Sequence, residues 1–313
     1  MNRLLKILAS VLALQAGLAV LLHFTSGNMS AYTSDEKLIS VEADSWDKIV
    51  IEDGEKPALV MMEKNGTWVL PDHYGFPASK TKLDSFTNKL REIKRSWPVA
   101  TTKGAAKRFK VKEDGYEKKI AFYKGDKKLE TLFIGSSPDF RKVHVRVSGD
   151  NDIYAIEFSA YEADVDPDGW VDKDFLHLKE DAIAQIKMPS FTLARKEGKW
   201  VVSGLKKSEE TVPEESSSLV SKLADISFRE VLGTENKPGY RQSSPALIIA
   251  ATMKSGENVN YVFSQEKDEE DIFILKVSSH EYYFKVGQYS VEDLQEFKRK
   301  KLIRLRKSDK IKN

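Results

Sequence analysis

The 313-residue sequence contains no cysteine. This absence excludes disulfide bonds, thiolate nucleophiles, zinc–thiolate sites and the lipidated cysteine of a lipoprotein. An excess of one charge is also missing, because 50 Lys and Arg residues are balanced by 48 Asp and Glu residues, for a formal net charge of +2. This near balance gives no reason to expect a nucleic-acid partner.

The sequence also lacks the short motifs of common active sites. It has no Gly-x-Ser-x-Gly elbow, no Gly-x-x-x-x-Gly-Lys-Ser/Thr phosphate loop and no Gly-x-Gly-x-x-Gly fingerprint. The five histidines are scattered, and none has a second histidine four positions away as in a zinc-binding helix. We therefore predict that the protein is not an enzyme, with no catalytic residue and no organic cofactor.

The N-terminal residues form a nearly continuous apolar run. Ile7 to Phe24 would span about 27 Å as a helix, close to the thickness of a bilayer core. Arg3 and Lys6 precede the run and place the N-terminus in the cytoplasm. We expect an uncleaved signal anchor, because the best cleavage candidate, Met29-Ser30-Ala31, has Met where a small residue belongs. Cleavage remains the alternative. The prediction is a single-pass inner-membrane protein with a periplasmic or extracytoplasmic ectodomain.

A six-residue pattern occurs twice in the ectodomain. Asn65-Gly66-Thr67-Trp68-Val69-Leu70 reappears as Glu197-Gly198-Lys199-Trp200-Val201-Val202, at an offset of 132. Each copy follows an alternating apolar run, and Asn-Gly between strands is a strong hairpin signal. The two tryptophans therefore pack in a core or against a hairpin; a groove for sugar or peptide is the alternative.

One amphipathic helix is predicted after each hairpin. The first begins near Ser79, and the second has Thr211 as the N-cap of a capping box with Glu214. The apolar positions of the two helices correspond at an offset of 133: Leu83, Phe86, Leu90 and Ile93 in one, Ser216, Leu219, Leu223 and Ile226 in the other.

Further strands follow each helix. Val145–Ser148 corresponds to Leu275–Ser278 at an offset of 130, and Asp172–Leu178 corresponds to Arg299–Leu305 at an offset of 127. The predicted fold class is α+β: a transmembrane helix over residues 1–28, then two tandem repeats over 29–178 and 179–313. Each repeat is a mostly antiparallel sheet with one main helix.

With the anchor, the paired Gly-x-Trp hairpins and the junction Trp170-Val171-Asp172-Lys173-Asp174-Phe175-Leu176 in hand, the chain resembles the bacterial domain-of-unknown-function family numbered 4340. Members of that family are often encoded beside ABC-transporter subunits of the gliding-motility type. The resemblance implies an accessory envelope role with an ABC-transporter permease and auxiliary subunit as partners. It implies no catalytic residue.

The junction also contains a candidate calcium loop. Asp164, Asp166, Asp168 and Asp172 stand at loop positions 1, 3, 5 and 9, as in an EF-hand. Position 12 is Phe175 where a bidentate Glu should close the coordination shell. An Asp-, Pro- and Gly-rich turn at a domain junction is the favoured reading, with calcium as the alternative.

The C-terminus is basic. The candidate interaction residues are Lys298, Arg299, Lys300, Lys301, Arg304, Arg306 and Lys307. A solvated tail is the simplest reading of such a run. Anionic lipid headgroups are the leading functional partner, and a protein or the acidic segment of the first repeat is the alternative.

From these features we expect a non-enzymatic, membrane-anchored accessory or scaffold subunit of an ABC-transporter-type export or envelope-remodelling complex. The alternative is a module that binds an envelope glycan or lipid.

Overall fold

The computed structural model describes residues 8, 11–17, 35–42, 45–267, 269 and 271–306. It is a mixed α+β structure of large antiparallel sheets and few helices, as the sequence predicts. The predicted anchor over Ile7 to Phe24 lies largely outside the described residues, of which 8 and 11–17 are helical. Within the described part of the chain, no helix has the length and apolar character needed to cross a membrane.

The first large sheet has eight strands in the order β10-β9-β8-β7-β1-β2-β3-β4. Its strands are β1 (Lys48–Glu52), β2 (Leu59–Lys64), β3 (Thr67–Leu70), β4 (Phe76–Pro77), β7 (Lys118–Lys124), β8 (Lys127–Ile134), β9 (Lys142–Val147) and β10 (Tyr154–Glu157). Helix α2 (Lys80–Glu92) and a short helix α3 (Lys103–Arg108) lie between β4 and β7 in the sequence, followed by the small hairpin β5 (Val111–Lys112) and β6 (Gly115–Tyr116).

The second large sheet also has eight strands, in the order β13-β12-β11-β16-β17-β18-β19-β15. They are β11 (Ile183–Met188), β12 (Phe191–Lys196), β13 (Lys199–Val202), β15 (Glu230–Val231), β16 (Leu247–Met253), β17 (Asn258–Gln265), β18 (Ile272–Val277) and β19 (Tyr283–Gly287). Helices α4 (Pro213–Ala224) and α5 (Gln288–Gln295) accompany it, and β14 (Glu209–Thr211) pairs with β20 (Ile303–Leu305).

Seven strands follow one another in the same order in both sheets. The run β3-β2-β1-β7-β8-β9-β10 of the first corresponds to β13-β12-β11-β16-β17-β18-β19 of the second. In both, the principal helix follows the three-stranded start in sequence and precedes the remaining four strands.

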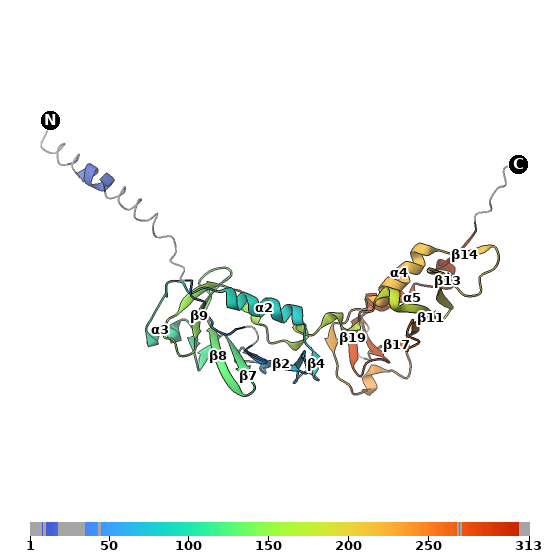
Figure 1. Cartoon of the computed structure of the whole chain (residues 1–313), viewed down its shortest axis with the longest axis horizontal. Helices are drawn as coiled ribbons and strands as arrows, with labels where there is room; N and C mark the ends of the chain where they lie inside the picture. Colours follow the sequence, from blue (N-terminus) through green and yellow to red (C-terminus); the bar gives the residue numbers. More distant parts are fainter. Residues whose placement is uncertain are drawn as a thin grey trace. The chain divides into compact units, whose positions relative to one another are not determined.

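Contacts within the chain gather into two compact units. Unit 1 comprises residues up to 60 together with 83–165, and unit 2 comprises 61–82 together with 166–313. In unit 1 the strand side chains that face the core are buried. The ring of Phe86, in α2, packs near that of Phe158, with the ring centroids 6.2 Å apart. In unit 2, α4 and α5 lie side by side, joined by an ion pair between Lys222 and Asp293 (Figure 1).

The two predicted hairpins are confirmed, with the predicted turn chemistry. Both turn residues have positive φ in each hairpin: 54° and 80° at Asn65 and Gly66, and 50° and 78° at Glu197 and Gly198. A two-residue turn with both φ angles positive matches the right-handed twist of the flanking strands. The strands on each side pair in register, Lys64 with Thr67 and Lys196 with Lys199.

The predicted capping box is wrong. Helix α4 begins at Pro213, and its N-cap residue Val212 makes no side-chain hydrogen bond. Thr211 instead belongs to β14, where its hydroxyl accepts a hydrogen bond from the Val202 amide at 2.9 Å. Pairing with β20 holds this residue in an extended strand, which removes it from the helix terminus.

The hydrogen bonds at the two helix entrances also give a different register for the last matched segment. The Ser79 amide donates to the Trp170 carbonyl at 2.7 Å, and the Val212 amide donates to the Leu302 carbonyl at 2.9 Å. Trp170 therefore occupies the position of Leu302, at an offset of 132, whereas the sequence alignment had matched Phe175 with Leu302.

Candidate functional site

The segment that follows the apolar N-terminal run is docked on unit 1. Leu38 and Ile39 are each only 1% exposed. The Leu38 amide donates to the Ile93 carbonyl at 2.8 Å, and the Arg95 amide donates to the Glu36 carbonyl at 2.9 Å. Residues 35–42 are thus held by burial of apolar side chains and by backbone pairing.

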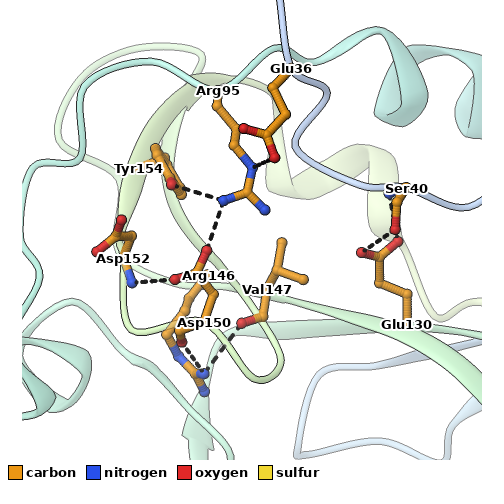
Figure 2. A network of polar contacts seen from close by, with 9 residues as sticks. All are labelled: Glu36, Ser40, Arg95, Glu130, Arg146, Val147, Asp150, Asp152 and Tyr154. Atoms are coloured by element: carbon orange, nitrogen blue, oxygen red, sulfur yellow. Dashed lines mark hydrogen bonds and ion pairs between the residues drawn. The ribbon is translucent and has the colours of Figure 1, made fainter. Parts of the chain in front are cut away.

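A network of charged and polar side chains links this segment to the rest of unit 1 (Figure 2). The Arg95 guanidinium donates to the carboxylate of Asp150 at 2.8 Å and to the hydroxyl of Tyr154 at 3.1 Å. Its Nε lies 3.5 Å from the Glu36 carboxylate. Nearby, the Ser40 amide donates to the Glu130 carboxylate at 2.9 Å. Arg95 therefore links the docked segment, the end of α2 and the β9–β10 turn.

The electrostatics of this network favour its charged form. Burial alone would raise the pKa of Asp150, but hydrogen bonds from the Asp152 amide and from Arg95 outweigh burial, and the pKa lies below its usual value. Burial likewise disfavours the charged form of Arg95, while hydrogen bonds to Asp150 and Tyr154 raise its pKa. Such mutual stabilisation is typical of a structural ion pair.

A second arginine, Arg146, donates hydrogen bonds to backbone carbonyls of the same turn. Arg146 is 9% exposed, and its Nε donates to the Val111 carbonyl at 2.8 Å. Its Nη1 donates to the Asp150 carbonyl at 3.1 Å (Figure 2). At the corresponding place in unit 2, the Lys276 ammonium donates to the His280 carbonyl at 2.5 Å. Each unit therefore stabilises this turn with a cation on backbone carbonyls.

Unit 1 also has a charged cavity of about 770 Å³. Four lysines and four carboxylates line it together with Tyr116 and Gly115: Lys107, Lys110, Lys112, Lys118, Asp53, Glu55, Asp114 and Glu117. Several of them are already paired, for example Lys110 with Glu117 at 2.8 Å and Lys112 with Asp114 at 2.8 Å. The cavity is polar and close to neutral, and the hydroxyl of Tyr116 donates to the Glu52 carboxylate at 2.8 Å.

Three of the four candidate calcium residues, Asp166, Asp168 and Asp172, belong to two capped turns, and Asp164 ends the preceding 3-10 helix Ala160–Ala163. The Asp166 carboxylate accepts a hydrogen bond from the Asp168 amide at 3.1 Å, and the Asp172 carboxylate accepts one from the Asp174 amide at 3.1 Å. These turns are short 3-10 helices over Pro167–Gly169 and Lys173–Leu176. Among the residues that the structure describes, no group of three or more His, Asp or Glu side chains is placed to hold a metal ion.

Within unit 2, the Asp168 carboxylate has a structural partner as well. It accepts a hydrogen bond from the Val231 amide at 3.1 Å, and its oxygen lies 3.5 Å from Nε2 of His73. The acidic segment thereby connects β15 with the chain before β4. Phe175, which stands at the twelfth loop position, contacts the rings of Phe76 at 4.6 Å and His280 at 4.5 Å.

The basic C-terminal residues are largely paired within unit 2. Arg304 lies 2.7 Å from the Glu210 carboxylate, and Lys301 lies 3.6 Å from that of Glu215. The Arg299 guanidinium donates to the Ser203 and Gly204 carbonyls at 2.7 Å each. The pairing of β20 with β14 brings these cations against a row of glutamates. Arg306 also donates, to the Glu209 carbonyl at 3.1 Å, while Lys298 and Lys300 lie in the same stretch and Lys307 lies outside the described residues.

The tryptophans divide into three groups. Trp46 and Trp170 are buried, at 7% and 0% exposure. Trp68 and Trp200 are half-buried hairpin residues opposite Glu63 and Arg195, in agreement with hairpin packing. Trp97, which precedes Pro98, is 68% exposed.

Sequence reasoning missed the Arg95 network completely. Glu36, Arg95 and Asp150 are far apart in the chain, and no local pattern joins them. The only local signal is the position of Arg95 just after Ile93, the last apolar position of the predicted helix.

The comparisons with known proteins place the chain in a family. No curated protein and no solved structure matches it. One family model matches residues 68–245, more than half of the chain, under the description "Domain of unknown function (DUF4340)". The matched region begins at Trp68 of the first hairpin and ends just before β16, so it covers parts of both units. The chain belongs to the DUF4340 family.

Proposed function

We propose that the protein is a membrane-anchored, extracytoplasmic accessory or scaffold subunit rather than an enzyme. The observation that carries the proposal is the docking of residues 35–42 on unit 1. This segment follows the apolar N-terminal run by ten residues. Its buried Leu38 and Ile39 and its pairing with Arg95 would hold the folded ectodomain close to the anchor.

We further propose that the two sheets arose by tandem duplication, with repeats over 29–178 and 179–313. The shared order of seven strands supports this division, as do the equivalent hydrogen bonds at the two helix entrances. A duplicated scaffold offers two similar faces to partners, whereas an enzyme would need a distinct reactive site in at least one copy.

The partner that the family resemblance suggests is an ABC-transporter permease with its auxiliary subunit. The paired charges of the described surface support a protein-binding role, because patterned charges at an interface select partners and fix their register. In this view the row of cations and glutamates at β14 and β20 is part of a protein-facing surface.

A second candidate is a module that binds an envelope glycan or lipid. The charged cavity of about 770 Å³ in unit 1 favours it, because its size is that of a small-ligand site and Tyr116 offers an aromatic face. Its internal ion pairs, such as Lys110 with Glu117, would have to open for a charged ligand.

Purification of the full chain from native membranes in mild detergent tests the proposal. An accessory subunit is expected to co-purify with a permease and its ATPase in constant proportion, and Arg304→Glu should weaken this association. Recovery of the chain alone with bound glycan or lipid would favour the second candidate. Recovery alone without either would contradict both.

A further inference from the structure

The connection that follows α2 is strongly basic. Between residues 93 and 112 the chain has seven cations and no acidic residue: Lys94, Arg95, Lys103, Lys107, Arg108, Lys110 and Lys112. We call residues 93–112 the basic connection. Some of its cations are paired with carboxylates from elsewhere in unit 1, such as Lys94 with Asp35 at 3.0 Å. Lys107 and Arg108 are exposed, and among the described residues no carboxylate is within ion-pair distance of either.

The same connection exposes apolar side chains. Trp97 is 68% exposed and Val99 is 46% exposed. They do not belong to a loose loop, because the Val99 amide donates to the Ile153 carbonyl at 2.7 Å and the Ile153 amide donates to the Ala100 carbonyl at 2.8 Å. Folding therefore fixes a large aromatic residue and a β-branched residue at the surface, beside a group of cations.

This surface lies where the chain arrives from its N-terminal run. Lys37 pairs with Lys94 in an antiparallel bridge, and the Glu36 carbonyl accepts from the Arg95 amide. The described part of this segment begins at Asp35, whose carboxylate lies 3.0 Å from the ammonium of Lys94, three residues before Trp97. Only ten residues separate Phe24 from Asp35, and they span at most about 36 Å when fully extended.

We propose that the basic connection is a docking surface for an anionic lipid bilayer, with Trp97 and Val99 at the headgroup level. The inference rests on the proposed anchor and deepens it, because it specifies which face of unit 1 meets the membrane. Trp side chains favour the interface between hydrocarbon and water. Lys and Arg residues next to an anchored segment are attracted to anionic headgroups within about a Debye length.

The corresponding connection in unit 2 lacks these properties. Residues 225–246 have three cations and three acids, a net charge of zero, whereas residues 93–117 have seven cations and three acids, a net charge of +4. Its two aromatic residues, Phe228 and Tyr240, are both buried at 5% exposure. Of the two connections, that of unit 1 combines a net positive charge with exposed apolar side chains, and that of unit 2 does not.

The absence of cysteine makes the test direct, because a single introduced cysteine is the only labelling site. The full chain carrying Val99→Cys would be labelled with an environment-sensitive fluorophore and reconstituted into phosphatidylcholine vesicles with or without phosphatidylglycerol. Ile248→Cys in unit 2 is the matched control, because Ile248 has nearly the same exposure, 48% against 46%. Lipids with a nitroxide near the headgroup serve as quencher, and thermal unfolding confirms that both variants are folded.

With phosphatidylglycerol present, we expect loss of most of the fluorescence at position 99 and little loss at position 248. Lys107→Glu with Arg108→Glu should reverse the loss, as should high salt. Equal quenching at the two positions in vesicle-bound protein would overturn the inference and leave the anchor intact. Protection of position 99 from an aqueous quencher without quenching by lipid would mean a protein contact and would also overturn it. Protein that does not float with the vesicles would contradict the anchor as well.

Discussion

In each unit, a connection joins the principal helix to the next long strand. It comprises residues 93–117 in unit 1 and residues 225–246 in unit 2, and the two connections start and end at equivalent places in the shared strand order. In unit 2 this connection turns inward: Phe228 packs 4.9 Å from Phe284 and 5.8 Å from Phe76. In unit 1 it turns outward, with exposed Trp97 and Val99. The start of the connection, just after the principal helix, is thus core in unit 2 and surface in unit 1.

The largest expected effect comes from the inward connection. Phe228→Ala should lower the free energy of unfolding by about 3–5 kcal/mol, because it leaves a cavity among Phe76, Phe284 and Lys173. Trp97→Ala is the matched change in the outward connection and should cost less than about 0.5 kcal/mol. Denaturant unfolding followed by circular dichroism measures both. Similar losses would mean that the two connections do not differ as described.

The backbone of the outward connection packs directly against Gly135, where no side chain fits. A Cβ atom at Gly135 would stand 2.0 Å from the Phe109 carbonyl oxygen and 2.5 Å from that of Lys110. Gly135→Ala should therefore destabilise unit 1 by about 3 kcal/mol, because backbone must move. In α3 of the same connection nothing lies within 4 Å of a Cβ at Gly104, and Gly104→Ala should stabilise by about 0.5–1 kcal/mol. The midpoints of thermal unfolding should move in opposite directions; a shift of the same sign would contradict the packing.

Arg95 joins the outward connection to the docked N-terminal segment. Arg95→Met leaves the Asp150 carboxylate without its 2.8 Å partner and should cost about 1–3 kcal/mol. Hydrogen exchange should show faster exchange of the Leu38 amide in this variant. Arg108→Met removes an exposed cation of the same connection and should leave that rate unchanged. Equal exchange rates in the wild type and Arg95→Met would show that the network does not hold the segment.

The smallest effect is a pH dependence. Because the folded protein lowers the pKa of Asp150, this carboxylate stabilises unit 1 fully above its ordinary pKa of about 3.9. The contribution is lost as the pH falls through the lower pKa of the folded state. Asp150→Asn should therefore flatten the acid limb of stability against pH. If Asp150→Asn leaves the loss of stability at low pH unchanged, other groups cause that loss.

The sequence predicted what is local. Both hairpins were visible because Asn65-Gly66 and Glu197-Gly198 carry the turn within two residues, and both helices were visible from apolar spacing. Most neighbouring strands in each sheet also follow one another along the chain. The exceptions are β7 beside β1 in the first sheet, and β16 beside β11 and β15 beside β19 in the second.

What the sequence did not show depends on contacts between distant residues. The partners of Arg95 are 55 and 59 residues away, and Arg304 meets Glu210 across 94 residues. The basic C-terminal run resembles a free tail in sequence because the glutamates that face it, such as Glu210 and Glu215, lie far away in the chain, just before α4 and in its first turn. The sequence alignment also matches the wrong residue with Leu302. Phe175 lies in a 3-10 turn, and the apolar residues of this turn resemble the end of a strand in sequence.

The central claim is that the N-terminal run anchors this ectodomain outside the cytoplasm, and one measurement addresses it directly. Tyr161→Cys places a single thiol at a position that is 93% exposed in unit 1. Spheroplasts are treated with a membrane-impermeant maleimide, lysed, and their membranes washed with alkaline carbonate. The account predicts labelled protein that stays with the membranes. Protein released by carbonate, or labelled only after lysis, would contradict it.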